Sequence, residues 1–129
     1  MKKQNILLFL LFTFSHFLFG QENNEIIGKW ILIKIDFNYQ IIQLDNDNYY
    51  LNITNEKISY KLEYNTCFSK EYTITKDSIN SKYFNCTEIC CDTNLDKKIN
   101  YNGKYSLTKN DNTLIIENEI GIYYLKRDY

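Results

Sequence analysis

Apolar and polar side chains alternate along several short stretches of this chain, as they do in β-strands with one face on a core and the other in water. In residues 49–54, Tyr49, Leu51 and Ile53 share one face, and residues 57–64 alternate in the same way. Residues 31–35 are apolar at nearly every position, which is typical of a strand buried on both sides. Further strands are predicted over residues 71–75, 78–84, 103–108, 113–117 and 121–126.

Turn signals separate these stretches and set the fold class. Proline is absent, and clusters of Asn and Asp such as residues 45–48 supply the turns. About eight short strands at this spacing predict an all-β domain, either a small antiparallel β-barrel or a sandwich. A barrel is favoured because closure removes exposed strand edges. One short helical segment is predicted over residues 92–99, where Asp92 or Thr93 can cap the first turn.

The first twenty residues have the pattern of a secretory signal peptide. Lys2 and Lys3 form a basic start, an apolar run follows, and Gly20 supplies a small residue at a cleavage position. The apolar run is too short for a stable membrane span, and an uncleaved membrane anchor is the alternative. We therefore expect residues 1–20 to be removed and residues 21–129 to form one β domain in a secreted or periplasmic location.

Charge and histidine content narrow the classes of function. Fifteen Lys and Arg, less Lys2 and Lys3, oppose sixteen Asp and Glu, which leaves the mature chain with a net charge of −3. This balance disfavours nucleic acid and anionic membranes as partners. The single histidine, His16, lies in the predicted signal, so the mature chain lacks the commonest general base and metal ligand. We expect no catalytic residues, no cofactor and no metal.

The four cysteines, Cys67, Cys86, Cys90 and Cys91, form the most specific pattern in the chain. A secreted domain with an even number of cysteines is expected to form disulfides; a zinc site and a redox site are the alternatives. A bond between the neighbours Cys90 and Cys91 would close a strained ring, so that pairing is set aside. Two pairings remain, and Cys67–Cys91 with Cys86–Cys90 is favoured. The longer bridge would contribute roughly 3 kcal/mol in the chain-entropy model.

Aromatic residues supply the candidate ligand site. The only tryptophan, Trp30, is expected to fill one end of the core. Several tyrosines fall on inward-facing positions, where apolar rings with hydroxyl groups could line a cavity in a barrel. The alternative is that they fill the interior, because a barrel of about eight strands is just wide enough for side chains. The predicted ligand-binding residues are Trp30, Tyr60, Tyr64, Tyr72, Tyr105 and Tyr124.

Three segments resemble the META-domain family, the heat-shock HslJ-like envelope proteins, and more broadly the bacterial lipocalin-like domains. Residues 28–32, Gly-Lys-Trp-Ile-Leu, are similar to the family's opening G-x-W-x-L strand, and Cys67 stands where the family has Gly-Cys-Asn. Residues 87–91 are similar to its Thr-x-x-x-Cys segment. The resemblance covers about residues 28–126. It implies a barrel-like secreted domain of the bacterial envelope, linked to envelope stress and antibiotic tolerance, without catalytic residues.

These observations favour a non-enzymatic, monomeric domain that binds a small apolar ligand or supports envelope stress tolerance. The alternative is a secreted inhibitor or protein-interaction domain that acts through an exposed Tyr/Ile surface, with an envelope protein as partner. A third hypothesis is an enzyme that uses carboxylates or tyrosine. The state of the interior separates the first two, because a fully packed core excludes an internal ligand and favours the surface.

Overall fold

The computed structural model describes residues 24–108, 110 and 112–129. These residues contain eleven β-strands and two single turns of 3-10 helix, and they contain no α-helix. The prediction of an all-β chain is therefore confirmed. In the same ranges no helix is long and apolar enough to cross a lipid bilayer. The predicted signal peptide, residues 1–20, lies outside the described residues.

The structure contains three short strands in addition to the eight that the sequence predicts. They lie in segments without a clear alternating pattern, and two of them carry cysteines. The strands are β1 (Gly28–Phe37), β2 (Gln40–Gln43), β3 (Tyr50–Ile53), β4 (Ile58–Lys61), β5 (Thr66–Ser69), β6 (Glu71–Ile74), β7 (Ser78–Lys82), β8 (Asn85–Cys86), β9 (Gly103–Leu107), β10 (Thr113–Glu117) and β11 (Ile122–Asp128), and the 3-10 turns are η1 (Asn24–Ile26) and η2 (Asp96–Lys98).

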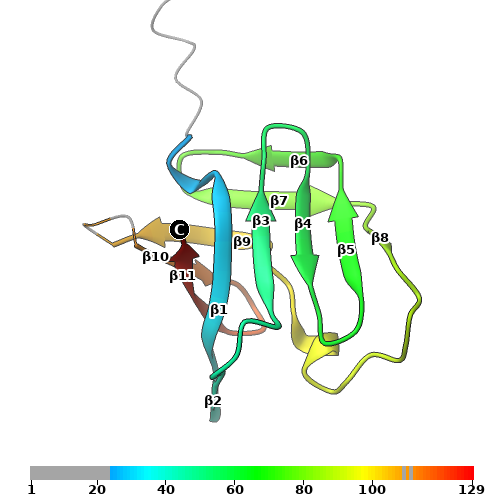
Figure 1. Cartoon of the computed structure of the whole chain (residues 1–129). Coiled ribbons are helices and arrows are strands. Elements are labelled where there is room, and N and C mark those ends of the chain that lie inside the picture. The colour runs from blue at the N-terminus through cyan, green and yellow to red at the C-terminus, as the bar shows by residue number, and fades with distance from the viewer. Residues whose placement is uncertain (1–23, 109, 111) are drawn as a thin grey trace, which may run out of the picture.

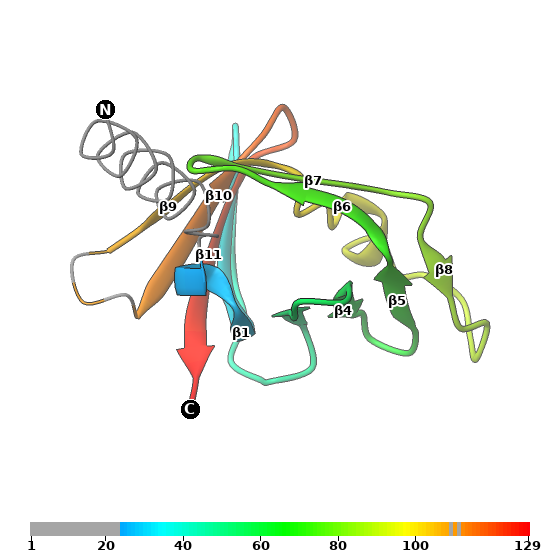
Figure 2. The ribbon, with the colours of Figure 1, turned by 90° about the horizontal axis from the view of Figure 1, so that it is seen from above.

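The strands form one antiparallel sheet that curls into a half-barrel (Figure 1). Their order is β6-β7-β9-β10-β11-β1-β3-β4-β5-β8, and β2 pairs with β1 outside this path. Figure 2 shows β6 and β7 on one side of the curl and β4 and β5 on the other. Within the described residues the end strands β6 and β8 do not pair, so the sheet stops short of the predicted closed barrel. The reason is that β8 is only two residues long before the chain turns away.

One serine holds the corner where the chain passes from β5 to β6. The Ser69 side chain is buried, and its hydroxyl donates to the carbonyl oxygens of Glu71 and Lys82. The Glu71 N–H donates back to Ser69 Oγ at 3.1 Å. A single side chain therefore ties the end of β5 to the β6–β7 hairpin.

The longest strand, β1, lies at the centre of the sheet and contains an irregularity. It pairs with β11 on one side, and with β2 and β3 on the other. Its register with β11 shifts between Leu32 and Lys34, as in a β-bulge. Because of the extra residue, Leu32 and Ile35 are both buried although they are three positions apart. The prediction of a strand over residues 31–35 is confirmed, but its predicted burial on both sides is wrong, because Ile31 and Ile33 are only half-buried.

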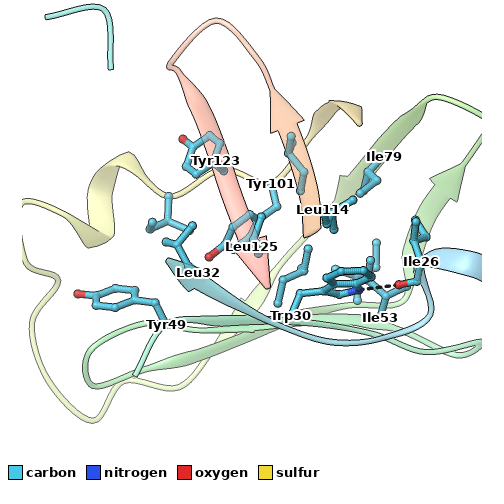
Figure 3. Packing of buried hydrophobic residues seen from close by; sticks show 14 of the residues in the cluster. Ile26, Trp30, Leu32, Tyr49, Ile53, Ile79, Tyr101, Leu114, Tyr123 and Leu125 are labelled. Atoms are coloured by element: carbon cyan, nitrogen blue, oxygen red, sulfur yellow. Dashed lines mark hydrogen bonds between the residues drawn. The ribbon is translucent and has the colours of Figure 1, made fainter. Parts of the chain in front are cut away.

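The concave side of the sheet holds the core (Figure 3). Trp30 is fully buried there, as predicted, and its indole Nε1 donates to the Ile26 carbonyl oxygen at 2.9 Å. Tyr49, Leu51 and Ile53 of the predicted alternating stretch are also buried. The other fully buried large side chains are Tyr123, Ile26, Leu32, Ile35, Ile58, Ile79, Leu114, Ile116 and Leu125.

The segment 87–102 covers one end of the half-barrel, between the two walls of the curl (Figures 1 and 2). Ile99 and Tyr101 of this segment are buried in the core. The helical segment predicted over residues 92–99 is reduced to η2, a single 3-10 turn. The residue before η2 is Leu95, which makes no side-chain cap, so the predicted cap by Asp92 or Thr93 is wrong; Thr93 Oγ1 nevertheless accepts the Asp96 N–H at 3.0 Å. The chain therefore fills its own concave side.

Candidate functional site

A disulfide joins Cys67 on β5 to Cys86 on β8 at the end of the sheet. The two residues stand opposite each other in the antiparallel pairing, with Cα atoms 4.0 Å apart. Both pairings kept from the sequence linked Cys67 to Cys90 or Cys91, and both are wrong. Strand pairing, which cysteine spacing does not reveal, brings Cys86 to Cys67 instead. The bridged residues are 19 apart in the sequence, and such a loop is worth about 3 kcal/mol in the chain-entropy model.

Cys90 and Cys91 remain as exposed free thiols beside this bond. Their sulfur atoms lie 2.7 Å apart, close enough for one thiol to donate a hydrogen bond to the other. This hydrogen bond, together with the charge of Cys90, raises the pKa of Cys91. The dithiol lies at the mouth of a cleft of about 420 Å³, which we call the cysteine cleft. The lining of this cleft also includes Tyr60 and Leu62 of the β4 region.

A buried amide fixes the backbone that precedes the dithiol. Asn65 is only 4% exposed, and its Nδ2 donates to the Cys90 carbonyl oxygen at 2.6 Å. Its Oδ1 accepts the Ile89 N–H at 2.8 Å. The adjacent Thr87 N–H donates to the Thr66 carbonyl oxygen at 3.0 Å. The segment 87–90 is therefore attached to the loop between β4 and β5.

A buried carboxylate fixes the backbone that follows the dithiol. Asp96 is 5% exposed, and it accepts hydrogen bonds from the Tyr49 hydroxyl at 2.8 Å, the Thr93 N–H at 2.9 Å and the Glu63 N–H at 3.3 Å. Burial alone would raise the pKa of Asp96, but these hydrogen bonds outweigh it and hold the pKa below its ordinary value. Burial also raises the pKa of Tyr49, to about 12, with the charge of Asp96 contributing.

Aromatic rings connect the cleft to the core. The Tyr60 ring meets Phe84 edge-on at a centroid distance of 5.1 Å and Tyr101 at 5.7 Å, and Tyr101 meets Tyr123 at 5.6 Å. Burial, followed by the charge of Asp92, raises the pKa of Tyr60. The Tyr123 hydroxyl donates to the Lys98 carbonyl oxygen at 2.6 Å. The buried Tyr101 hydroxyl has no hydrogen-bond partner among the described residues.

The chemistry that this arrangement supports is recognition and thiol chemistry. The carboxylate of Asp96 accepts hydrogen bonds from three donors. Within the described residues, no group of three or more His, Cys, Asp or Glu side chains is placed to hold a metal ion. The thiols of Cys90 and Cys91 are exposed and accessible to reagents from solvent.

The six predicted ligand-binding residues lie at different places in the described part of the chain. Tyr60 lines the cysteine cleft, Trp30 is part of the core, and Tyr64 is exposed. The remaining three are half-buried: the hydroxyls of Tyr72 and Tyr105 donate to the Thr54 and Thr75 carbonyl oxygens, and the Tyr124 ring lies 4.0 Å from Lys34 Nζ. Ligand binding by these residues stays a prediction.

The inward position predicted for Tyr124 is wrong. Tyr123 and Leu125 of β11 are fully buried, so Tyr124 lies on the opposite face of the strand. The sequence could not assign the faces, because Ile122 and Tyr124 form an apolar pair as good as Tyr123 and Leu125.

Four exposed apolar side chains lie in or next to β5 and β8, the two strands that the disulfide joins. We define the β5–β8 edge surface as Tyr64, Phe68, Tyr83 and Ile89. Tyr83 and Ile89 are 76% and 75% exposed. Phe68 is opposite Asn85 in the β5–β8 pairing, and Ile89 is held by Asn65, the neighbour of Tyr64.

Tyr83 has an unusual backbone conformation as well as an exposed ring. Its φ angle is +56°, the only positive φ of a non-glycine residue in the described part of the chain. Left-handed backbone at a bulky residue is unfavourable by about 1–2 kcal/mol. Such conformations gather at functional positions, where an exposed side chain must be held in a set direction.

Asn65 and Asp96 are the site residues that sequence reasoning missed. One signal was present for Asp96: residues 93–96 begin with Thr and end with Asp, a capping-box pattern. Asn65 carried no comparable signal, because an Asn after Tyr64 resembles the many Asn residues in exposed turns.

Comparisons with known proteins find no matching family model, no matching curated protein and no matching solved structure. The resemblance to META-domain proteins accordingly stays a prediction.

Proposed function

We propose that this chain is a secreted, non-enzymatic domain that binds a protein partner through the β5–β8 edge surface. The observation that carries the proposal is the exposure of four apolar side chains, Tyr64, Phe68, Tyr83 and Ile89, in and next to the strands that the Cys67–Cys86 disulfide joins. Exposed apolar side chains gathered on one surface are typical of protein-interaction sites, and aromatic residues contribute most to such interfaces.

Two further features support a surface role. The chain's own segment 87–102 and a set of fully buried side chains occupy the concave side of the sheet, where a lipocalin-like ligand would bind. The edge is also held by several bonds: the disulfide joins β5 to β8, and Asn65 hydrogen-bonds to the segment that follows β8. A preformed surface loses less conformational entropy when it binds.

The test compares serine substitutions on the edge surface with matched substitutions far from it in the sequence and sheet. Tyr83→Ser and Ile89→Ser change the surface, while Tyr39→Ser and Ile41→Ser change exposed residues at the β1–β2 hairpin. We expect the first pair to abolish recovery of a specific partner from envelope or culture-medium proteins and the second pair to retain it. Equal recovery by all four variants would reject this surface as the binding site.

A second candidate function is binding of a small, partly apolar ligand by a META-like or lipocalin-like domain. It is favoured by the cleft of about 420 Å³ lined by Tyr60, and by the hydroxyl of Tyr101, which has no hydrogen-bond partner in the described part of the chain and whose ring contacts that of Tyr60. Native mass spectrometry of protein purified from its own source tests it. A retained small molecule that Tyr60→Ala releases would support this function, and ligand-free protein would count against it.

A further inference from the structure

The Cys67–Cys86 disulfide leaves only one intramolecular partner for each remaining cysteine. Cys90 and Cys91 are both exposed, so small molecules reach either thiol from solvent. Their bonding to Cys67 or Cys86 is excluded while the disulfide is closed. Whatever thiol chemistry this pair performs therefore takes place between the two neighbours or with a reagent from outside.

The backbone brings the two sulfur atoms to the same side. Neighbouring residues in an extended strand project to opposite faces, which keeps their side chains apart. The chain leaves β8 after Cys86 and bends at Ile89 and Cys90, and the sulfur atoms lie 2.7 Å apart. A disulfide needs a separation of about 2.05 Å, so bond formation requires only a small further approach.

Both flanks of the dithiol are fixed to the body of the domain. On the N-terminal side, Asn65 bonds the Ile89 N–H and the Cys90 carbonyl oxygen. On the C-terminal side, Thr93 and Asp96 bond each other reciprocally, and Asp96 is also held by Tyr49. The short bend between these anchors loses little additional conformational freedom when the two sulfurs join.

We propose that Cys90 and Cys91 form a vicinal disulfide, an eight-membered ring that closes by thiol–disulfide exchange with a low-molecular-weight disulfide. One cysteine thiolate attacks a sulfur of the reagent, forms a mixed disulfide and releases one thiol. The second cysteine, after losing its proton to solvent, attacks the protein sulfur of that mixed disulfide and releases the second thiol. The two cysteines are oxidised by two electrons and the reagent is reduced to two thiols.

This ring is the pairing that the sequence disfavoured because of its strain. The structure changes that judgement, since the bend and its two anchors already hold the sulfurs together. Closure converts two exposed thiols at the mouth of the cysteine cleft into a neutral disulfide. It makes this position an oxidation site that is separate from the structural Cys67–Cys86 bond.

The experiment incubates the non-reduced full chain with oxidised glutathione and maps tryptic peptides without reduction. Trypsin places Cys67 on residues 62–70 and the other three cysteines on residues 83–97. We expect these two peptides to be linked and to lose about 2 Da more than one disulfide explains, with no attached glutathione and no uptake of iodoacetamide. Two alkylated cysteines, or glutathione that persists on the wild-type chain, would overturn the proposal.

The variants Cys90→Ser and Cys91→Ser provide the matched controls. Each retains one thiol without a neighbour to displace the glutathione, so each is expected to accumulate a stable mixed disulfide. Failure of both variants to react would overturn the proposal, because the exchange begins with attack by an exposed thiol. All three pairings give linked peptides of the same mass, so the linked peptides are also fragmented, and a fragment spectrum that bonds Cys67 to Cys90 or Cys91 in the wild-type chain would overturn the proposal as well.

Discussion

The Tyr49 hydroxyl donates a 2.8 Å hydrogen bond to Oδ1 of Asp96, a residue 47 positions further along the chain. Tyr49 directly precedes β3 in the wall of the half-barrel, and Asp96 begins the 3-10 turn that covers its end. The bond therefore joins the sheet to the segment that carries Cys90 and Cys91. Both residues are buried, so the hydrogen bond is shielded from water.

Replacing Asp96 with Asn should loosen this connection. The amide nitrogen of Asn is a donor and would face one of the three donors that Asp96 accepts. We expect a loss of about 1–3 kcal/mol in the free energy of unfolding, measured by urea denaturation at pH 7. Unchanged stability would show that the carboxylate does not hold the segment.

The same substitution should change how stability depends on pH. Folding lowers the pKa of Asp96, so its contribution is complete above the unfolded-state value of about 3.9 and disappears as pH falls through the folded-state pKa. The stability difference between wild type and Asp96→Asn should thus shrink below about pH 4. A difference that stays constant from pH 7 to pH 3 would contradict the assigned shift.

Tyrosine-to-phenylalanine substitutions at two buried positions should have opposite effects. Tyr101→Phe removes a buried hydroxyl that has no partner among the described residues, so stability should rise by about 1 kcal/mol. Tyr123→Phe removes the hydrogen bond to the Lys98 carbonyl oxygen, so stability should fall by about 1 kcal/mol. Thermal and urea unfolding measure both, and a loss of stability in Tyr101→Phe would mean that its hydroxyl is bonded.

The substitution Tyr83→Asn should raise the stability of the fold and weaken the binding of a partner. Asn accepts left-handed backbone more readily than Tyr, and the Tyr83 ring is too exposed to contribute much packing. We expect a gain of roughly 0.5–1 kcal/mol in the free energy of unfolding together with weaker partner binding. Tyr39→Asn, at an exposed residue outside the surface, is the control and should leave binding unchanged. A less stable Tyr83→Asn variant would argue against strain at this position.

The alternation of apolar and polar residues predicted the buried face of a strand only where the other face is polar. Alternation placed Tyr49, Leu51 and Ile53 on the buried face, because one side of that stretch is clearly polar. It failed on β11, where both faces are apolar and Tyr124 was assigned inward. The bulge in β1 could not be seen either, since an extra residue changes no residue type.

The cysteine pairing depended on contacts that sequence spacing does not encode. Cys86 reaches Cys67 only because two short strands without an alternating pattern happen to pair. The site residues show the same limit: Asn65 and Asp96 act through hydrogen bonds to groups 24 to 47 positions away in the sequence. The positions of the four cysteines did identify the region of the candidate site, because all four lie in it or beside it.

Site-specific photo-crosslinking tests the proposed binding surface most directly. A photoreactive phenylalanine analogue replaces Tyr83 in one variant and Tyr39 in the other, and both are exposed to light in their native envelope or medium. We predict one discrete crosslinked protein from position 83 and none from position 39, and the Ile89→Ser substitution should abolish the crosslink. Crosslinks of equal yield from both positions, or a crosslink from position 83 that survives Ile89→Ser, would contradict a partner bound at the β5–β8 edge surface.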